Sequence, residues 1–99
     1  MFIIELTYKK AMSEVEDHLE AHRTFLDEQY AIGTFVASGP KNPRDGGVIL
    51  AGDMDRNALE KILQQDPFYI HEISQFRITD FKVTKGSYIK VKPMCKTPI

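Results

Sequence analysis

The feature that most constrains the fold is the order of strand-like and helix-like segments along the chain. Residues 2–8 alternate in polarity, and the members that share one strongly apolar face are Phe2, Ile4, Leu6 and Tyr8. In two longer segments apolar residues recur at spacings near three and four, the pattern of an amphipathic helix. The predicted elements are a strand at 2–8, a helix at 13–31, strands at 34–39 and 48–51, a helix at 55–65 and a strand at 73–84.

This β-α-β-β-α-β order predicts a ferredoxin-like α+β domain. In that arrangement four strands form one antiparallel sheet and two helices cover one of its faces. The opposite face would show apolar side chains such as Ile3 and Val36. A monomer seldom leaves that much apolar sheet surface in water. We therefore expect a homodimer, or a higher homo-oligomer, that packs sheet to sheet or through the last strand.

Local signals predict where the helices begin and end. Ser13 and Glu16 have the spacing of a capping box at the start of the first helix. Gly33 is placed to cap that helix at its C-terminus. Asp55 is placed to cap the second helix at its N-terminus.

The last predicted strand changes its apolar phase partway. Phe76 and Ile78 fall on even positions. Phe81 and Val83 fall on odd positions. A period of two cannot shift in this way without a bulge or a change of environment, so we expect a bulge near residues 79–80.

Composition narrows the class of function. The chain has 99 residues, with 13 basic and 14 acidic side chains and a net charge of −1, a balance that argues against nucleic acid as the partner. No apolar run approaches the roughly 18 residues of a membrane-spanning helix, and the N-terminus shows no targeting leader. The single cysteine, Cys95, fits a reducing compartment. These observations predict a cytoplasmic protein that binds neither nucleic acid nor a membrane.

Lysines gather towards the C-terminus, where no acidic residue follows Asp80. They are Lys82, Lys85, Lys90, Lys92 and Lys96. We interpret this pattern as an edge or a tail that is kept soluble by lysine.

His22 is the residue best suited to proton chemistry. It lies one turn after Leu19 and one turn before Phe25, on or at the edge of the buried stripe of the first helix. This spacing alone favours a buried structural histidine, although histidine is also the side chain best placed for proton transfer near neutral pH. Asp66 is its candidate partner, because Pro67 pushes the preceding residue out of helical geometry. The alternative for Asp66 is a turn-forming Asp-Pro pair.

His18 and His22 have the i, i+4 spacing of metal ligands on a helix. The HExxH pattern is incomplete, because Leu19 follows His18, and no third ligand is obvious. We therefore expect no metal ion, and we interpret His18 as a solvated helix residue among acidic neighbours.

The loop at residues 40–47 is dense in Pro, Asn, Asp and Gly. Its glycines, with Gly39 just before it, would let the backbone approach a ligand closely, although tight turns explain the same composition. Arg44 in this loop, or Arg77 in the last strand, could pair with a carboxylate of a ligand. Ser38 or the loop amides could stabilise developing oxyanion charge.

Taken in order, these features resemble the YciI-like family (YCII-related domain), small dimeric proteins of the ferredoxin-like α+β class that include muconolactone-isomerase-like members. The resemblance rests on His22, on Gly33 eleven residues later, on Gly39-Pro40, and on Asp66-Pro67-Phe68 after the second helix. It covers a domain of residues 1–85 and leaves residues 86–99 as a C-terminal extension.

The resemblance implies a His–Asp pair in a pocket, with His22 as general acid and base and Asp66 as its orienting partner. One branch of the family is similar to enzymes that remove chloride from chlorinated hydroxyquinols. Leu19 departs from relatives that carry an arginine three positions before the histidine, and this departure bears on how substrate charge is recognised. The residues expected to contact a substrate are Ser38, Gly39, Pro40, Arg44, Phe68 and Arg77.

Two functions are compatible with this pattern. The first is a lyase or isomerase that moves a proton on a small acidic or cyclic organic molecule and requires no metal or organic cofactor. The second is a non-catalytic dimeric module that binds a small ligand or a protein through the same cleft. The discriminating observation is whether His22 and Asp66 meet at the bottom of an open pocket or lie sealed among apolar side chains.

Overall fold

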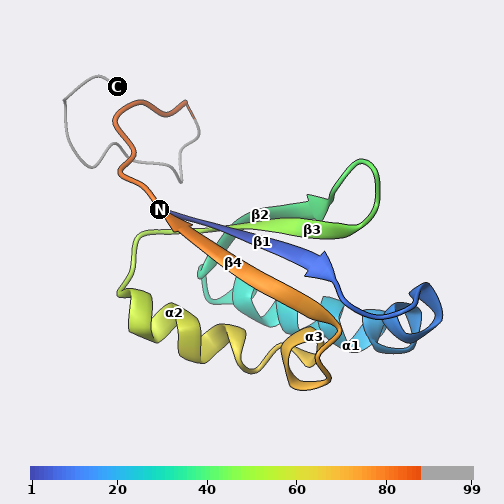
Figure 1. The fold of residues 1–99 in the computed structure, drawn as a ribbon. Helices are drawn as coiled ribbons and strands as arrows, with labels where there is room; N and C mark the ends of the chain where they lie inside the picture. The colour runs from blue at the N-terminus through green and yellow to red at the C-terminus, as the bar shows by residue number, and fades with distance from the viewer. Residues whose placement is uncertain (88–99) are drawn as a thin grey trace.

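The computed structural model describes residues 1–87 as a layer of helices packed on one face of a sheet (Figure 1). The elements are β1 (Phe2–Tyr8), α1 (Met12–Ala31), β2 (Phe35–Pro40), β3 (Gly46–Ala51), α2 (Arg56–Leu63), α3 (Pro67–Ile70) and β4 (Ser74–Asp80). The strands are antiparallel in the order β2-β3-β1-β4. The predicted ferredoxin-like α+β fold is confirmed, and the one-turn helix α3 is an addition that the pattern did not predict.

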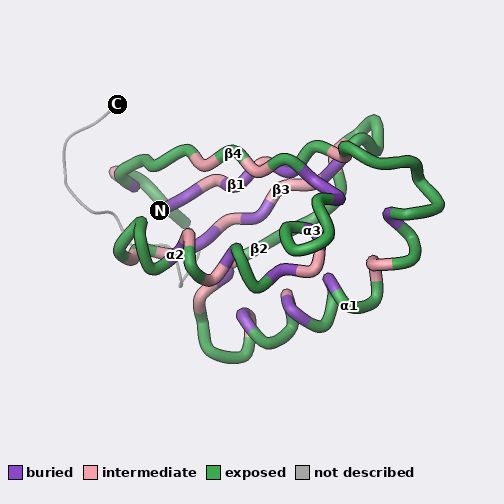
Figure 2. Tube along the Cα trace, turned by 60° about the horizontal axis from the view of Figure 1, so that its bottom comes forward, coloured by how far each residue is buried: buried purple, intermediate pink, exposed green. Residues whose placement is uncertain are grey.

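The core lies between the sheet and the helices, and Figure 2 shows that the buried positions of α1 lie on the side turned to the sheet. β1 contributes Phe2, Ile4 and Leu6, the alternation that its sequence predicted. The remaining buried apolar residues of this core are Val15, Phe25, Phe35, Ile49, Ala51, Leu59, Leu63, Phe68 and Ile73.

The predicted capping box at the start of α1 is wrong. The helix begins at Met12, so Ser13 already lies inside it, and no side chain caps the first turn. The carbonyl of Ala11 accepts the backbone N–H groups of Glu14 and Val15, the first bonds within the helix. Alanine has no side-chain acceptor, so the first N–H groups of α1 have no side-chain cap.

The other two predicted caps are confirmed. Gly33 adopts φ 82°, and the N–H groups of Gly33 and Thr34 bond back into the last turn of α1 at 3.1 and 2.9 Å. These two bonds form a Schellman motif, which turns the chain from α1 into β2. The carboxylate of Asp55 accepts the backbone N–H of Ala58 at 3.1 Å and caps α2.

The bulge predicted in the last strand is also wrong. β4 pairs with β1 in unbroken register along its whole length and ends at Asp80. Phe81 and Val83 lie beyond the strand, so the change of phase marks the end of the strand. The register shift of the sheet lies instead in β2, between Phe35 and Ala37.

Most of the predicted C-terminal extension, including Cys95 and the last three lysines, lies outside the described residues. Within residues 1–87, no helix combines the length and the apolar character needed to cross a membrane.

Candidate active site

His22 and Asp66 form a buried pair between α1 and α3. His22 lies in α1, and Asp66 is the residue immediately before α3. The Nδ1 atom of His22 lies 2.8 Å from Oδ1 and 3.0 Å from Oδ2 of Asp66. Asp66 is completely buried and His22 is 9% exposed. The fold thus joins two polar side chains that lie 44 residues apart in the sequence.

Asp66 reaches this position because it separates two helices. α2 ends at Leu63 and Pro67 begins α3, so Asp66 has an extended backbone with φ −67° and ψ 127°. Its Oδ1 accepts the backbone N–H of Phe68 at 2.9 Å and so caps α3. The predicted effect of Pro67 on the preceding residue is confirmed. The cap bond also holds the carboxylate in one orientation, facing α1.

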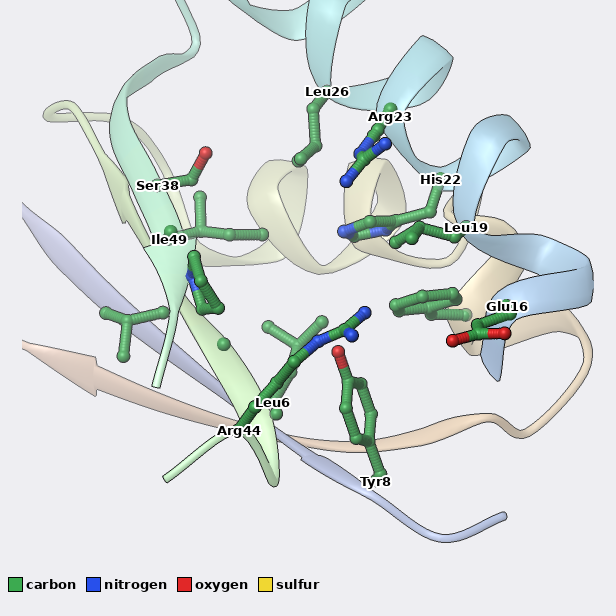
Figure 3. Close-up of a pocket in the computed structure, with 16 residues that line it drawn as sticks. Leu6, Tyr8, Glu16, Leu19, His22, Arg23, Leu26, Ser38, Arg44 and Ile49 are labelled. Atoms are coloured by element: carbon green, nitrogen blue, oxygen red, sulfur yellow. The ribbon is translucent and has the colours of Figure 1, made fainter. Parts of the chain in front are cut away.

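The pairing decides which ring nitrogen of His22 is available for chemistry. An ionised carboxylate can only accept hydrogen bonds, so Nδ1 is the nitrogen that donates. Nε2 is then the nitrogen that can take up a proton, and the ring of His22 points into the pocket (Figure 3). Phe68 stacks on the ring with centroids 4.0 Å apart and planes 3° from parallel. The carboxylate and the stacked ring together restrict rotation of the imidazole.

The pocket in front of His22 has a volume of about 580 Å³. It lies between α1 and the inner face of the sheet, at the end where β1 finishes and the β2–β3 loop begins (Figure 3). Its apolar lining comes from Leu6, Leu19, Leu26, Val48, Ile49 and Phe68. Its polar side chains are Tyr8, Glu16, His22, Arg23, Ser38 and Arg44. A small molecule here would meet an apolar surface and several hydrogen-bond donors.

Five of the predicted substrate contacts line this pocket. They are Ser38, Gly39, Pro40, Arg44 and Phe68. Ser38 has a partner outside the prediction, because the hydroxyl of Tyr30 donates to its Oγ at 2.6 Å. Since that oxygen accepts from Tyr30, the serine's own proton remains available to a ligand.

The structure does not bring Arg77 to the pocket. In the sheet Arg77 of β4 lies opposite Glu5 of β1, and the next residues along the two strands, Leu6 and Phe76, lie opposite one another. Successive side chains of a strand point to opposite faces. Because Leu6 lines the pocket, Arg77 belongs to the outer face of the sheet. The substrate contact predicted for Arg77 does not fit this geometry.

His18 and His22 do not act as a pair. The ring of His18 stacks on that of His71, with centroids 4.2 Å apart and planes 21° from parallel. His22 is engaged with Asp66 through Nδ1. Among residues 1–87 there is no group of three or more His, Cys, Asp or Glu side chains that could hold a metal ion.

Three polar residues of the pocket, Tyr8, Glu16 and Arg23, were not predicted from the sequence as part of the site. Glu16, Leu19, Arg23 and Leu26 recur at helical spacing and line the pocket together. That stripe was a usable signal for Glu16 and Arg23. The alternation of β1 predicted Tyr8 on the apolar face of the strand. Tyr8 is on that face at the end of β1, where its hydroxyl enters the pocket (Figure 3).

The fold and the site define a class: a ferredoxin-like α+β protein with a buried His–Asp pair beside an open pocket. The profile of the YCII-related domain matches residues 1–82, and the chain belongs to this family. No curated protein matches the chain significantly.

Among solved structures, the fold is similar to that of 5-chloro-2-hydroxyhydroquinone dehydrochlorinase (TftG) from Burkholderia phenoliruptrix in complex with 2,5-dihydroxybenzoquinone. The TM-score is 0.68, and the alignment covers 84% of this chain and 95% of that chain. The sequence identity is 14%, so the likeness is one of fold.

Proposed function

We propose that this protein is an enzyme that moves a proton on a small organic molecule, with His22 as general acid and base. The observation that carries the proposal is the buried bond from Nδ1 to Asp66 beside an open pocket. A histidine with only a structural role would lie sealed among apolar side chains, whereas His22 lines the pocket. Asp66 has the position of the orienting partner, buried behind the ring.

The proton transfer follows from this arrangement. Nε2 takes a proton from the substrate, and the imidazolium that forms is stabilised by the carboxylate of Asp66. In an isomerase, Nε2 returns the proton to a second atom of the substrate. In a lyase, the electron pair of the broken C–H bond forms a double bond while a leaving group such as chloride departs with its own pair. Neither route needs a metal or an organic cofactor.

The proposed substrate is small and acidic or cyclic. Arg44 and Ser38 supply donors for anionic oxygens, and Leu6 and Ile49 supply an apolar surface for a ring. The dehydrochlorinase of similar fold is named for a chlorinated hydroxyhydroquinone and holds a dihydroxybenzoquinone. Elimination of chloride from such a ring is therefore one reaction within the proposed class.

The second candidate function is a non-catalytic module that binds a small ligand or a protein. The polar lining of the open pocket favours it, because Glu16, Arg23 and Arg44 can hold a ligand without any proton transfer. The two candidates differ in whether bound molecules exchange hydrogen with water.

The experiment is a thermal-shift screen of small hydroxy-aromatic and lactone acids, followed by NMR of each hit in D₂O. A ligand stabilises only the state that it binds. The enzyme should exchange a carbon-bound hydrogen of a hit, and His22→Gln should lower that rate by about 10²- to 10⁴-fold while still binding the hit. Exchange at the wild-type rate in His22→Gln would refute the proposal. Binding without exchange in the wild type would favour the non-catalytic module.

We also propose that two chains associate through the outer face of the sheet. By strand alternation this face carries Ile3 and Leu50, which lie opposite one another and are each partly exposed in the single chain. A second copy would remove this apolar strip from water.

A further inference from the structure

The pocket has polar groups that the proposed proton transfer does not use. Tyr8 ends β1, Arg44 lies in the β2–β3 loop, and both line the pocket with His22. In Figure 3 the hydroxyl of Tyr8 and the guanidinium of Arg44 point toward one another and into the space in front of His22. No side-chain hydrogen bond or ion pair within residues 1–87 engages either group. Both are therefore donors that a ligand can occupy.

The ring of Tyr8 is held by its contact with Phe68. The two rings meet edge to face, with centroids 6.1 Å apart and planes at 87°. The ring of Phe68 also stacks on His22. Phe68 thus sets the positions of His22 and Tyr8 relative to one another, with the proton acceptor and the hydroxyl facing the same space.

The loop that carries Arg44 is tied to β1. The backbone N–H of Tyr8 donates to the carbonyl of Asp45 at 2.8 Å, so Arg44 is one residue from an anchor point. Lys41 lies 3.4 Å from the carboxylate of Asp45 and 3.4 Å from that of Glu5. Because the loop backbone is already fixed, less ordering is required when Arg44 binds a ligand.

We infer that Tyr8 and Arg44 form an oxyanion-binding pair that acts together with His22, and that the substrate bears a carbonyl group next to the carbon that loses its proton. The inference rests on the proposed function of His22. As Nε2 takes the proton, the C–H electron pair forms a carbon–carbon double bond and the carbonyl π pair moves to oxygen. That enolate oxygen accepts hydrogen bonds from Tyr8 and Arg44. Donors aimed at the atom where charge develops lower the barrier of such a step.

The charge and shape of the lining narrow the substrate class further. The lining has two basic side chains, Arg23 and Arg44, and one acidic side chain, Glu16. The pocket therefore favours a ligand that is anionic or becomes anionic when it loses a proton. Leu6 and Ile49 offer an apolar surface to a ring. The inferred substrate is an enolisable cyclic carbonyl compound, a class that includes the keto forms of polyhydroxylated rings.

The test uses para-nitrophenol, a planar probe whose phenolate oxygen resembles an enolate oxygen and whose ionisation is visible by absorption. The wild-type protein should bind the phenolate in preference to the neutral phenol, so the bound probe should ionise at a lower pH than the free probe. It should bind neutral para-nitroanisole more weakly than the phenolate. Tyr8→Phe and Arg44→Gln should each weaken phenolate binding by about tenfold or more. Binding of para-nitroanisole should change little. Tyr8→Phe retains the ring that packs on Phe68, and Arg44 is exposed, so both variants should fold.

Matched controls are Tyr69→Phe and Arg56→Gln, which make the same chemical changes at exposed positions outside this pocket. Phenolate affinity in Tyr8→Phe and Arg44→Gln equal to that of these controls would overturn the inference. An equal loss of para-nitroanisole binding would overturn it too, since the effect would then be one of shape. Hydrogen exchange in D₂O separates this inference from the proposed role of His22. If Tyr8→Phe and Arg44→Gln lose phenolate binding while His22→Gln exchanges at the wild-type rate, only the role of His22 is refuted.

Discussion

At the scale of single residues, Asp66 carries two bonds that explain its burial. A carboxylate without partners is costly to bury. Oδ1 of Asp66 accepts the backbone N–H of Phe68, and both carboxylate oxygens lie within hydrogen-bonding distance of Nδ1 of His22. The same carboxylate therefore begins α3 and selects the tautomer of the histidine. Folding and the proposed chemistry depend on one side chain.

Asp66→Asn should separate these two tasks. The amide oxygen at the Oδ1 position can still accept the N–H of Phe68, and the amide nitrogen then takes the Oδ2 position, 3.0 Å from Nδ1 of His22. The amide is neutral, so it no longer stabilises the imidazolium that forms when Nε2 takes up a proton, and its nitrogen favours the tautomer that carries the proton on Nε2. We expect turnover or hydrogen exchange to fall by about 10²- to 10⁴-fold, with a loss of only about 1–2 kcal/mol in the free energy of unfolding.

Kinetics on a hit compound and thermal denaturation measure these two effects. Asp55→Asn is the matched control, because Asp55 caps α2 through the same kind of bond but does not line the pocket. It should leave exchange at the wild-type rate. Full activity in Asp66→Asn would contradict the assigned role of the carboxylate.

At the scale of elements, the pairing of β1 with β3 depends on a glycine at the start of β3. Gly46 lies opposite Thr7 at the end of the ladder. A Cβ atom at Gly46 would fall 1.7 Å from the carbonyl oxygen of Leu6, and neither strand can move aside without breaking the ladder. Gly46 thus allows the β2–β3 loop to lie against β1, and this contact places Arg44 at the pocket.

Gly46→Ala should therefore be strongly destabilising. We expect a loss of about 3 kcal/mol in the free energy of unfolding, in the range of severe overpacking. Urea denaturation followed by circular dichroism measures it. Gly39→Ala is the control, because a Cβ atom at Gly39 meets nothing within 4 Å. Equal free energies of unfolding for the two variants would mean that the close approach of Gly46 to β1 does not limit the size of this residue.

At the scale of the whole molecule, the two faces of the sheet have different neighbours. The helices cover the inner face (Figure 1). The pocket lies between α1 and one end of that face. The outer face has no helix over it within residues 1–87, and Ile3 lies beside Leu50 there. An apolar strip of this kind is the physical reason to expect a second chain.

Ile3→Lys should convert the proposed dimer into a monomer. A lysine beside Leu50 would place a charge in the middle of the apolar interface, where it has no partner. Sedimentation velocity at micromolar concentration should give twice the chain mass of 11.3 kDa for the wild type and the single mass for the variant. Ile32→Lys, at a side chain that is 73% exposed, is the control and should remain dimeric. A monomeric wild type would contradict the sheet-face argument.

The order of elements and their buried faces could be predicted from the sequence. The alternation of β1, the glycine after α1 and the carboxylate before α2 are local signals that act within a few residues. The break at Pro67, which frees Asp66 from helical geometry, is local in the same sense. One local signal misled: Ser13 and Glu16 have the spacing of a capping box, but α1 already begins at Met12, so Ser13 lies inside the helix.

The tertiary structure alone decided which of these residues meet. Arg44 and Arg77 are equivalent as isolated arginines, but strand register places Arg77 on the outer face and the loop places Arg44 in the pocket. The alternation of β1 predicts that Tyr8 belongs to the core. Tyr8 is the last residue of the strand, and its hydroxyl lies in the pocket (Figure 3). Periodicity specifies which side of an element is buried. It does not specify what lies across from that side, because that depends on how distant segments pair and pack.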